Sequence, residues 1–415
     1  MITSRGFYRM RASDHVRRTR CGELVVPKSL QSMTSVRVRF RDLSVEIEER
    51  RVILRVLDEL LSTGELILGR EVEKLEAELA NFCKRRFAVG VASGTSALYL
   101  ALRALGIGKG DEVVTTPLTW VATANAIVMT GATPIFVDVN DDFLMAPDLA
   151  EASITPKTAA LLPVDFFGRL CDLRSLRRIT DEHGLRLIVD GAQSFGATRD
   201  GCLSGQIGDA IAFSLNPMKV LAGVGEAGAL IFDDEALFER AKSLRYLGTV
   251  NKETCMEPEL NHKIDALHAS VLRIRLQGLA TLLECRQRIA ATYSDLLSDL
   301  EPRVFTPKHE FGEHPTHFDY AIRCERRDEL EAFLLEAGIE VKVRHRQTVP
   351  DHPAYIRYRS AHIPTARRLV GQLLCLPIHE KLSVTDLEMV SALIHDFYRR
   401  IRTNVKKSLS EVVEE

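Results

Sequence analysis

The chain has few of the features that assign a protein to a class at once. Its eight cysteines include no Cys-x-x-Cys pair, and its twelve histidines include no His-Glu-x-x-His motif. Cysteines scattered singly argue against a zinc knuckle and are typical of a compartment that keeps thiols reduced. His314 and His317 lie in a polar loop that contains proline, and we interpret them as surface residues rather than metal ligands. No apolar run reaches the roughly 18 residues that span a bilayer, so we expect neither a metal site nor a membrane segment.

An excess of charge of one sign is also missing. The chain has 55 Lys and Arg residues against 57 Asp and Glu residues, for a formal net charge of −2. This balance gives no indication of a nucleic-acid partner. Its 46% hydrophobic and 27% charged residues are ordinary for a soluble globular protein, and 415 residues are enough for roughly two or three domains. We expect a cytoplasmic protein of enzyme size.

The two ends of the chain differ from the rest. Residues 1–36 begin with "MITSRGFYRMRASDHVRRTR", which is rich in arginine and poor in acids, as a transit peptide is. The segment has neither a sustained apolar face nor the apolar region of a secretory signal. We therefore expect a disordered extension, or a true start at Met33, with targeting as the alternative. Residues 403–415 are expected to form a polar tail.

From Val38 onward, patterns of helices and of buried strands alternate. Helical spacing covers residues 44–64, 70–84, 95–105, 120–131 and 172–184. Short apolar runs predict strands at residues 87–92, 111–116, 133–139, 159–165, 185–190 and 210–215. Strands buried on both faces and joined by helices predict an open, mostly parallel α/β sheet. In such sheets ligands bind at the carboxyl ends of the strands.

Polar residues follow three of these predicted strands. Ser93, Gly94 and Thr95 open a helix whose free N–H groups could hold an anion, although the same triplet is more often a plain cap. Asp190 ends an apolar strand and would either cap a loop or face a cationic ligand. Lys219 is the single full positive charge in "AFSLNPMKVLAGVGEAGAL". It either points into water from a loop or supplies an amine for chemistry.

An anion site, a carboxylate and an amine at one edge of a sheet match the needs of pyridoxal 5'-phosphate. Its phosphate needs a helix N-terminus, its pyridine nitrogen an acid, and its aldehyde a lysine that can form a Schiff base. Burial of Lys219 among apolar residues and glycines would disfavour its ammonium form and so make the amine a better nucleophile. The three features together therefore favour the chemical use of Lys219.

The sequence resembles the DegT/DnrJ/EryC1/StrS aminotransferases, which are sugar aminotransferases. The resemblance extends from about Val38 to about Arg400. It rests on "GELILGREVEKLEAELANF", on the segment from "VGVASGTSALYLALRALG" to "GATPIFVDV", and on "IVDGAQSFGA", "AFSLNPMKVLAGVGEAGAL" and "CLPIHEKLSVTDLEMV". It implies a fold-type I PLP-dependent transferase with a mostly parallel, seven-stranded-type sheet and a smaller C-terminal α+β domain. We place the large domain at residues 37–255 and the small domain at residues 256–402.

The resemblance also implies roles for individual residues. Lys219 matches the lysine that joins the cofactor, Asp190 the partner of the pyridine nitrogen, and Gln193 the glutamine beside the ring. The remaining cofactor contacts implied in this way are Gly94, Thr95, Ser214, Asn216, Trp120 and Asn261. Trp120 falls where the family places an aromatic ring over the pyridine, although a lone tryptophan is more often a core residue. Asn261 matches an asparagine that reaches the partner subunit's phosphate, which implies a homodimer.

Three positions depart from the family pattern. Asn216 stands where the family usually has His or Tyr, and Asn261–Ile264 reads Asn-His-Lys-Ile where the family usually reads Asn-Tyr-Arg-Met. His268 stands where Gln is frequent. Because Lys cannot replace the planar contacts of Arg, the substrate side is altered. Lys263 and His345 are candidate substrate contacts, with a surface role as the alternative for His345.

The C-terminal part is expected to begin with one long amphipathic helix at residues 265–300, which bridges the two domains. A small α+β unit follows, with "HFDYAIRC", a helix at residues 327–338 and "EVKVR". His379 is interpreted as structural.

The activity that the resemblance implies is transfer of an amino group from L-glutamate or L-glutamine to a keto-sugar. Nucleotide-linked keto-sugars are the first expectation, and keto-cyclitols the alternative. Some relatives dehydrate their substrate, but those known carry histidine in place of the lysine. A regulatory relative that binds PLP without catalysis is the remaining alternative.

Overall fold

The computed structural model describes residues 36–358 and 362–413, with residues 403–413 as backbone only. Most of the predicted N-terminal extension, residues 1–35, lies outside these residues, as do the last two residues of the predicted tail. The description below concerns the unit from Arg37 onward.

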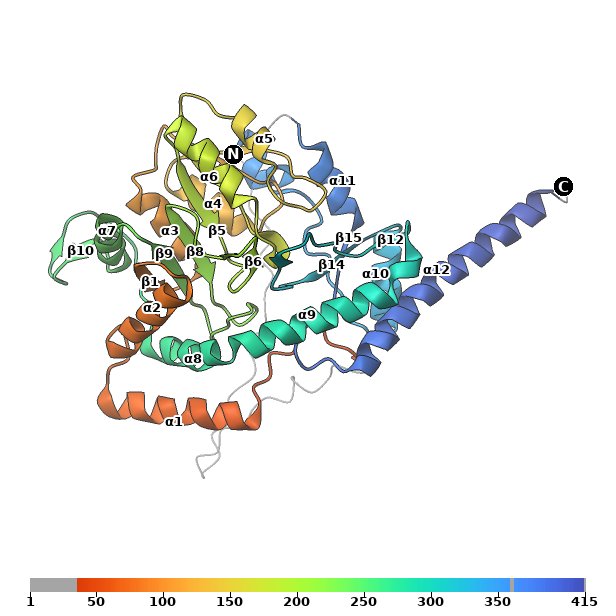
Figure 1. The fold of residues 1–415 in the computed structure, drawn as a ribbon, viewed down its shortest axis with the longest axis horizontal. Helices are drawn as coiled ribbons and strands as arrows, with labels where there is room; N and C mark the ends of the chain where they lie inside the picture. The colour runs from red at the N-terminus through yellow and green to blue at the C-terminus, as the bar shows by residue number, and fades with distance from the viewer. Residues whose placement is uncertain (1–35, 359–361, 414–415) are drawn as a thin grey trace, which may run out of the picture. The chain divides into compact units, whose positions relative to one another are not determined.

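A seven-stranded sheet forms the centre of this unit (Figure 1), with the strand order β1-β9-β8-β5-β4-β2-β3. The strands are β1 (Phe87–Val91), β2 (Glu112–Thr115), β3 (Thr133–Phe136), β4 (Thr158–Leu162), β5 (Arg186–Asp190), β8 (Ala210–Ser214) and β9 (Gly228–Phe232). The β2, β3, β4, β5 and β8 strands pair in parallel, whereas β9 pairs antiparallel with both β1 and β8. The predicted fold class, a mostly parallel α/β sheet, is confirmed.

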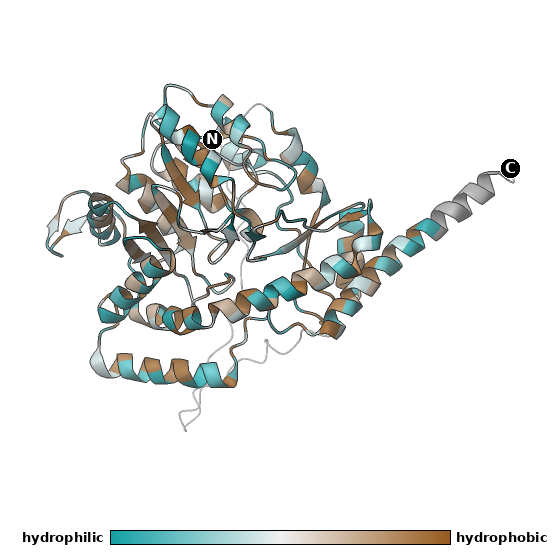
Figure 2. Cartoon of the chain, in the orientation of Figure 1, coloured by the Kyte–Doolittle hydropathy of each residue, from teal (hydrophilic) through white to brown (hydrophobic). Residues whose placement is uncertain are grey.

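Successive residues of the strands point to two separate cores. In β5, Ile188 belongs to the core beneath α3 (Gly94–Ala104) and α4 (Val121–Met129), and Leu187 and Val189 belong to the opposite core. Helices α2 (Arg70–Phe82), α6 (Leu173–His183) and α8 (Ala266–Gln277) pack on that opposite side. Both faces of the sheet are thus covered. Figure 2 shows the consequence, because the strands carry hydrophobic colour along their length while the covering helices alternate hydrophobic and hydrophilic stretches.

The prediction of one long helix at residues 265–300 is wrong, because the structure has two helices there. Helix α8 ends at Gln277 and α9 (Leu279–Leu296) begins directly after Gly278. Gly278 has φ −94° and ψ 0°, and its N–H donates to the carbonyl oxygen of Arg275, which is a tight terminal turn. Glycine costs about 1 kcal/mol relative to alanine inside a helix. The amphipathic pattern continues across this break, so the pattern alone did not show it.

The C-terminal part has its own sheet and core. Strands β12 (Val304–Phe305), β14 (Tyr320–Cys324) and β15 (Leu373–Leu376) form an antiparallel sheet. Its core includes residues of α9, α10 (Arg327–Glu336) and α12 (Val384–Val413). The remaining helices are α1 (Ile47–Thr63), α5 (Pro147–Ala152), α7 (Glu235–Arg245) and α11 (Pro364–Gln372). Short pairings involve β6 (Thr198–Arg199), β7 (Cys202–Leu203), β13 (Glu313–His314), β10 (Thr249–Val250) and β11 (Thr254–Cys255).

The prediction for one histidine is also wrong. His314 is exposed, but His317 is only 7% exposed, and its ring lies 5.1 Å from that of His309. Burial lowers the pKa of His317 to about 3. Within residues 36–358 and 362–413, no group of His, Cys, Asp and Glu has the arrangement of a metal site, and no helix is long and apolar enough to cross a membrane.

Candidate functional site

The carboxyl ends of β5 and β8 and the turn after β1 meet at one edge of the sheet. A Cβ atom on Gly94 would lie 2.5 Å from Cβ of Ser214, so no side chain fits at position 94. A Cβ atom on Gly228, the first residue of β9, would lie 2.4 Å from the carbonyl carbon of Ser93. These contacts place the N-terminus of α3 directly against the end of β8. The sequence-predicted phosphate contacts Gly94 and Ser214 are therefore neighbours.

The first turn of α3 presents free N–H groups at this edge. The Ser93 hydroxyl caps the helix by accepting a hydrogen bond from the N–H of Ser96 at 3.0 Å. Thr95 is exposed, and no acidic residue lies in the first turn. The helix dipole and the N–H groups of this turn favour an anion. The plain capping role and the anion role are compatible here, because the Ser93 hydroxyl satisfies only one of the free N–H groups.

Asp190 is a buried carboxylate at the end of β5, with 4% of its surface exposed. Its Oδ2 accepts a hydrogen bond from the Thr123 hydroxyl at 2.7 Å, and its Oδ1 accepts one from the N–H of Ala192 at 3.1 Å. Burial raises the pKa of Asp190, and this outweighs the two hydrogen bonds and Lys219, which lower it. The bond to Ala192 is the loop cap that position alone suggested. It leaves a desolvated carboxylate whose hydrogen-bond donors are neutral, which favours a cationic ligand.

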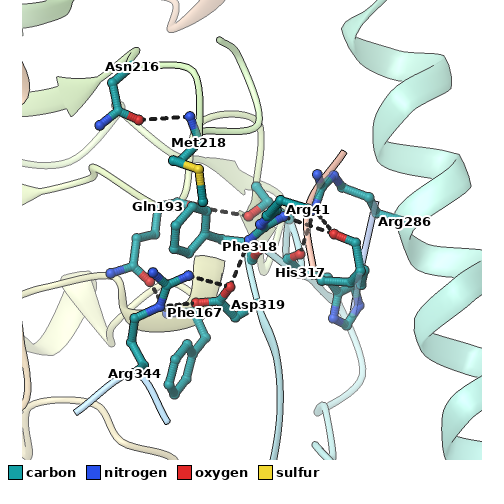
Figure 3. A network of polar contacts seen from close by, with 12 residues as sticks. Arg41, Phe167, Gln193, Asn216, Met218, Arg286, His317, Phe318, Asp319 and Arg344 are labelled. Atoms are coloured by element: carbon teal, nitrogen blue, oxygen red, sulfur yellow. Dashed lines mark hydrogen bonds and ion pairs between the residues drawn. The ribbon is translucent and has the colours of Figure 1, made fainter. Parts of the chain in front are cut away.

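Lys219 lies on the turn that follows β8. The Asn216 side chain accepts a hydrogen bond from the N–H of Met218 at 3.0 Å (Figure 3). The Asn216 carbonyl accepts one from the N–H of Lys219 at 3.0 Å. Asn216 thus shapes the turn that carries the lysine. Lys219 as a whole is half-buried, but its amine points inward and lies 4.5 Å from the centroid of the Phe318 ring. Because the Phe318 ring is itself buried, Lys219 does not point freely into water. Burial lowers the pKa of Lys219 to about 8.

Trp120 and Gln193 are both placed at the same edge of the sheet. Trp120 is the N-cap residue of α4 and is 62% exposed, so it is not a core residue. The Gln193 side-chain carbonyl accepts a hydrogen bond from the N–H of Phe167 at 2.7 Å (Figure 3). Its orientation is therefore set by the loop after β4. The hydrogen bond from Thr123, on α4, to Asp190 ties the helix that Trp120 opens to the buried carboxylate.

The segment with Asn261 and Lys263 runs beside β1. Lys263 forms a bridge with Val91, and its amine lies 4.1 Å from the centroid of the Tyr246 ring. Asn261 is exposed, and its side-chain oxygen accepts a hydrogen bond from the N–H of Lys263 at 3.2 Å. The roles of Asn261 toward a partner subunit and of Lys263 toward a substrate stay predictions.

His345 is buried rather than presented at the surface, with 9% of its area exposed. Its ring centroid lies 5.3 Å from that of Phe166, in the loop after β4. Burial, together with the nearby Arg344, lowers the pKa of His345 to about 4, so it is neutral at physiological pH. The surface alternative for His345 is wrong. Its predicted contact with a substrate is not tested by this geometry.

Sequence reasoning missed a charged cluster close to Lys219. Asp319 accepts hydrogen bonds from Arg41 at 2.7 Å and from both Nε and Nη2 of Arg344, at 2.8 and 2.7 Å (Figure 3). The Asp319 side chain is fully buried, and those of Arg41 and Arg344 are 5% and 15% exposed. The one available signal was an aspartate at the start of an apolar strand in "HFDYAIRC". Its partners lie 278 and 25 residues away along the chain.

A cavity of about 660 Å³ reaches this region. Its lining includes the turn Pro217–Val220 and the segment Arg41–Glu46, but not Asp190 or Ser214. Its size falls within the ~300–1,000 Å³ typical of small-molecule sites.

Comparison with known proteins identifies relatives that cover almost the whole unit. The model of the DegT/DnrJ/EryC1/StrS aminotransferase family matches residues 47–395. The chain is 38% identical over 373 residues to dTDP-3-amino-3,4,6-trideoxy-alpha-D-glucose transaminase of Streptomyces venezuelae, which covers 88% of this chain and 97% of that protein. It is 35% identical over 363 residues to the pleiotropic regulatory protein of Geobacillus stearothermophilus, which covers 86% of this chain and 98% of that protein. Among solved structures, S. venezuelae DesV in complex with a ketimine intermediate matches with a TM-score of 0.84 and 37% identity, over 87% of this chain and 98% of that one.

Proposed function

Because the chain belongs to the DegT/DnrJ/EryC1/StrS aminotransferase family, we propose that it transfers an amino group from L-glutamate or L-glutamine to the ketone of a nucleotide-linked sugar. The named activity of the relative from S. venezuelae, a transaminase for a dTDP-linked sugar, supports this class of acceptor. A keto-cyclitol is the alternative acceptor.

The residues at the edge of the sheet fit pyridoxal 5'-phosphate. Gly94, at the N-terminus of α3, packs so closely against Ser214 that position 94 cannot carry a side chain. The free N–H groups of this turn, beside the Ser214 hydroxyl, would hold the phosphate. Lys219 and Asp190 supply an amine and a carboxylate within electrostatic reach of each other. When bound, this cofactor supplies a carbonyl carbon that amines attack and a ring that takes up negative charge.

The depressed pKa of Lys219, about 8, gives the amine a useful free-base fraction near neutral pH. In that form it can attack a carbonyl carbon, and it can then accept and return a proton at the reacting carbon. Asp190 would hold a proton on a ring nitrogen, because a cation there would stabilise its buried charge. Trp120 and Gln193 would orient the ring, one from its face and one from its edge.

The observation that carries the proposal is the combination of Asp190 and Lys219. Within the described chain, no cation lies within salt-bridge distance of Asp190, although the carboxylate is buried. An amine of depressed pKa lies beyond the end of the neighbouring strand. Such pairs of perturbed groups cluster at functional sites.

The direct test offers nitrogen-labelled glutamate or glutamine with a series of keto-sugar nucleotides and keto-cyclitols, read by product mass. We expect label in an amino-sugar nucleotide. Borohydride treatment of the protein with its cofactor should add the cofactor's mass to the peptide that contains Lys219, and Lys219→Ala should abolish both results. Cofactor fixed on a different lysine would overturn the assignment of Lys219.

A regulatory role is the second candidate, because one relative is named a pleiotropic regulatory protein. It predicts that the protein binds the cofactor but that no amino donor converts it. Donor-driven loss of the yellow colour of the bound cofactor, measured with L-glutamate alone, separates the two candidates.

We also propose a homodimer. The hairpin β10–β11 and its flanks carry four exposed apolar side chains, namely Leu247, Val250, Met256 and Leu260, which are 39–67% exposed. Their position just before Asn261 supports a contact that brings Asn261 to a second subunit. Sedimentation of the parent and of Met256→Glu would test this, with a shift toward monomer expected for the variant.

A further inference from the structure

Three cationic side chains surround the ring of Phe318. The Lys219 Nζ atom lies 4.5 Å from the ring centroid, and the guanidinium carbons of Arg41 and Arg344 lie 4.9 and 5.2 Å from it. The ring itself is 3% exposed and is therefore held in place by its surroundings. A cation over the face of an aromatic ring is attracted by the ring quadrupole, and more strongly where water is excluded. Phe318 is thus a defined resting place for the free amine of Lys219.

The two arginines are fixed beside the ring by one carboxylate. Asp319 receives Arg41 through a single bond and Arg344 through two parallel bonds. Arg41 donates in addition to the carbonyl oxygens of Ile378, at 2.9 Å, and of Phe318. Since two guanidinium groups share one carboxylate, one positive charge of this cluster is left uncompensated. That charge faces the ammonium form of Lys219.

Two opposing effects therefore act on the protonated amine. The ring face stabilises it, and the excess positive charge destabilises it. The charged groups that face Lys219 come from separate elements: Asp190 from β5, Arg344 from the segment after α10, Asp319 from the residue before β14, and Arg41 from the N-terminal segment. Burial is the largest influence and lowers the pKa of Lys219; the two arginines lower it further, and the two carboxylates raise it.

We propose that Phe318 is a positioning residue that receives the free amine of Lys219, and that the Arg41–Asp319–Arg344 cluster limits how firmly the ring holds that amine when it is protonated. The inference rests on the proposed function, because it matters only if Lys219 is in turn joined to a carbonyl carbon and released. A ring that held the ammonium too firmly would keep the amine from attacking again. Without the ring, the Lys219 side chain would have no fixed position for its free amine.

Competitive acetylation of the cofactor-free protein tests the proposal without any use of the cofactor. The acetylation rate of Lys219, read by peptide mass across a pH series that brackets about 8, gives the pKa of its amine. Phe318→Leu removes the ring, so we expect a pKa lower by about half a unit. Arg344→Gln removes a like charge and leaves Asp319 less compensated, so we expect a pKa higher by about half a unit or more.

Two further variants serve as controls. Phe318→Tyr keeps the ring and should keep the parent's pKa. Arg323→Gln removes an arginine that lies over a different ring, that of Phe305 at 5.0 Å, and should also leave Lys219 unchanged. If Phe318→Leu does not fold, Phe318→Met replaces it, because it also removes the ring and should lower the pKa of Lys219 in the same way.

Shifts in opposite directions for Phe318→Leu and Arg344→Gln would support the proposal, since a general loosening of the site moves both variants the same way. Equal shifts, shifts of the same sign, or no shift in either variant would overturn it. The acetylation result does not depend on amino transfer, so a failed substrate screen would count against the proposed function and not against this inference. Conversely, if the enzyme transfers amino groups but neither variant changes the pKa of Lys219, this inference is wrong and the proposed function stands.

Discussion

Asp190 and Asp319 are two buried aspartates within electrostatic reach of the same lysine, and the chain treats them differently. Asp190 accepts hydrogen bonds from a hydroxyl and a backbone N–H, and burial raises its pKa. Asp319 is as deeply buried, but Arg344 and Arg41 outweigh the effect of burial and lower its pKa. A buried charge is stable only when a partner compensates it. The fold supplies the partners of Asp319, whereas no cation of the described residues lies within salt-bridge distance of Asp190, as its proposed role toward a cationic ligand requires.

Substitution of Asp190 should produce the largest effect on turnover. Asn keeps the size and a hydrogen-bond acceptor but removes the charge that would hold a protonated ring nitrogen. A contact ion pair near ~4 Å at an effective dielectric of about 20 is worth roughly 4 kcal/mol. If most of this acts on the transition state, single-turnover transfer in Asp190→Asn should fall on the order of 10²- to 10³-fold. Cofactor occupancy should persist, because Gly94 and Ser214 are unchanged.

The matched control for Asp190→Asn is a true helix cap. Asp172 caps α6 by accepting a hydrogen bond from the N–H of Ser175 at 3.1 Å. Asp172→Ala should cost about 1 kcal/mol of stability and leave turnover near the parent value. Should Asp190→Asn behave like this control, Asp190 would be a loop cap and not the partner of the cofactor.

Substitution of Asp319 should produce the largest effect on stability. Asp319→Asn leaves Arg41 and Arg344 buried without a counter-charge, and we expect a loss of about 3–5 kcal/mol in the free energy of unfolding. Denaturant titration measures it. Glu182→Gln removes an exposed pair with Arg178, whose side chains are 51% and 62% exposed, and should change stability by less than about 0.5 kcal/mol. If both variants lose equally little stability, the ion pairs of Asp319 do not stabilise the fold.

Gly94→Ala tests the anion cradle with a smaller expected effect. The new Cβ atom would lie 2.5 Å from Cβ of Ser214, so the start of α3 must move away from β8. We expect affinity for the cofactor to fall roughly 10-fold or more, while overpacking costs about 1–3 kcal/mol. Titration of the cofactor-free protein followed by absorbance gives the affinity. Ala at Gly371, where a Cβ meets nothing within 4 Å, is the control and should bind as the parent does.

The smallest expected effect concerns pH. Asp165 resembles Asp190 in that its side-chain oxygens accept hydrogen bonds from neutral groups, the N–H of Cys171 and the Ser194 hydroxyl, at 2.9 and 2.8 Å. Burial raises the pKa of Asp165 to about 7. The folded state then binds this proton more tightly than the unfolded state, where the pKa is about 3.9. Stability should therefore fall as the pH rises from about 4 through about 7.

Asp165→Asn should flatten this dependence, because the amide keeps an acceptor and has no proton to lose. Melting temperatures at pH about 5 and about 8 measure the slope for the parent and the variant. For Asp319→Asn, the dependence of melting temperature on pH should change in the acid range instead. In the parent, the pKa of the Asp319 carboxylate is lowered, so it contributes stability above about pH 4 that is lost on acidification. If melting temperature depends on pH in the same way in the parent and in Asp165→Asn, the pKa of Asp165 is not raised.

Much of the site was predictable because strand polarity orders it. Asp190 ends a strand, Lys219 follows one, and Gly94 follows another, so their meeting at one edge needed only the prediction of a parallel sheet. No such rule predicts that Arg41 and Arg344 meet Asp319. Arg41 precedes the first helix and Asp319 lies directly before a strand of the C-terminal sheet, and 278 residues separate them. Charged residues are common in this chain, and nothing local distinguishes a buried pair from exposed ones.

The alternation of apolar strands and amphipathic helices by itself determined the α/β class and the edge of the sheet at which the proposed site lies, because side-chain period and strand direction are local properties of the chain. The antiparallel position of β9 between β1 and β8, the break at Gly278 and the burial of His317 and His345 were decided only by the tertiary structure. Each depends on which segments pack against one another. The same holds for Lys219, whose isolation in the sequence marked it as unusual. Its pKa is lowered first by burial and then by Arg344 and Arg41, against the opposite effect of two carboxylates, and only folding brings these groups to it.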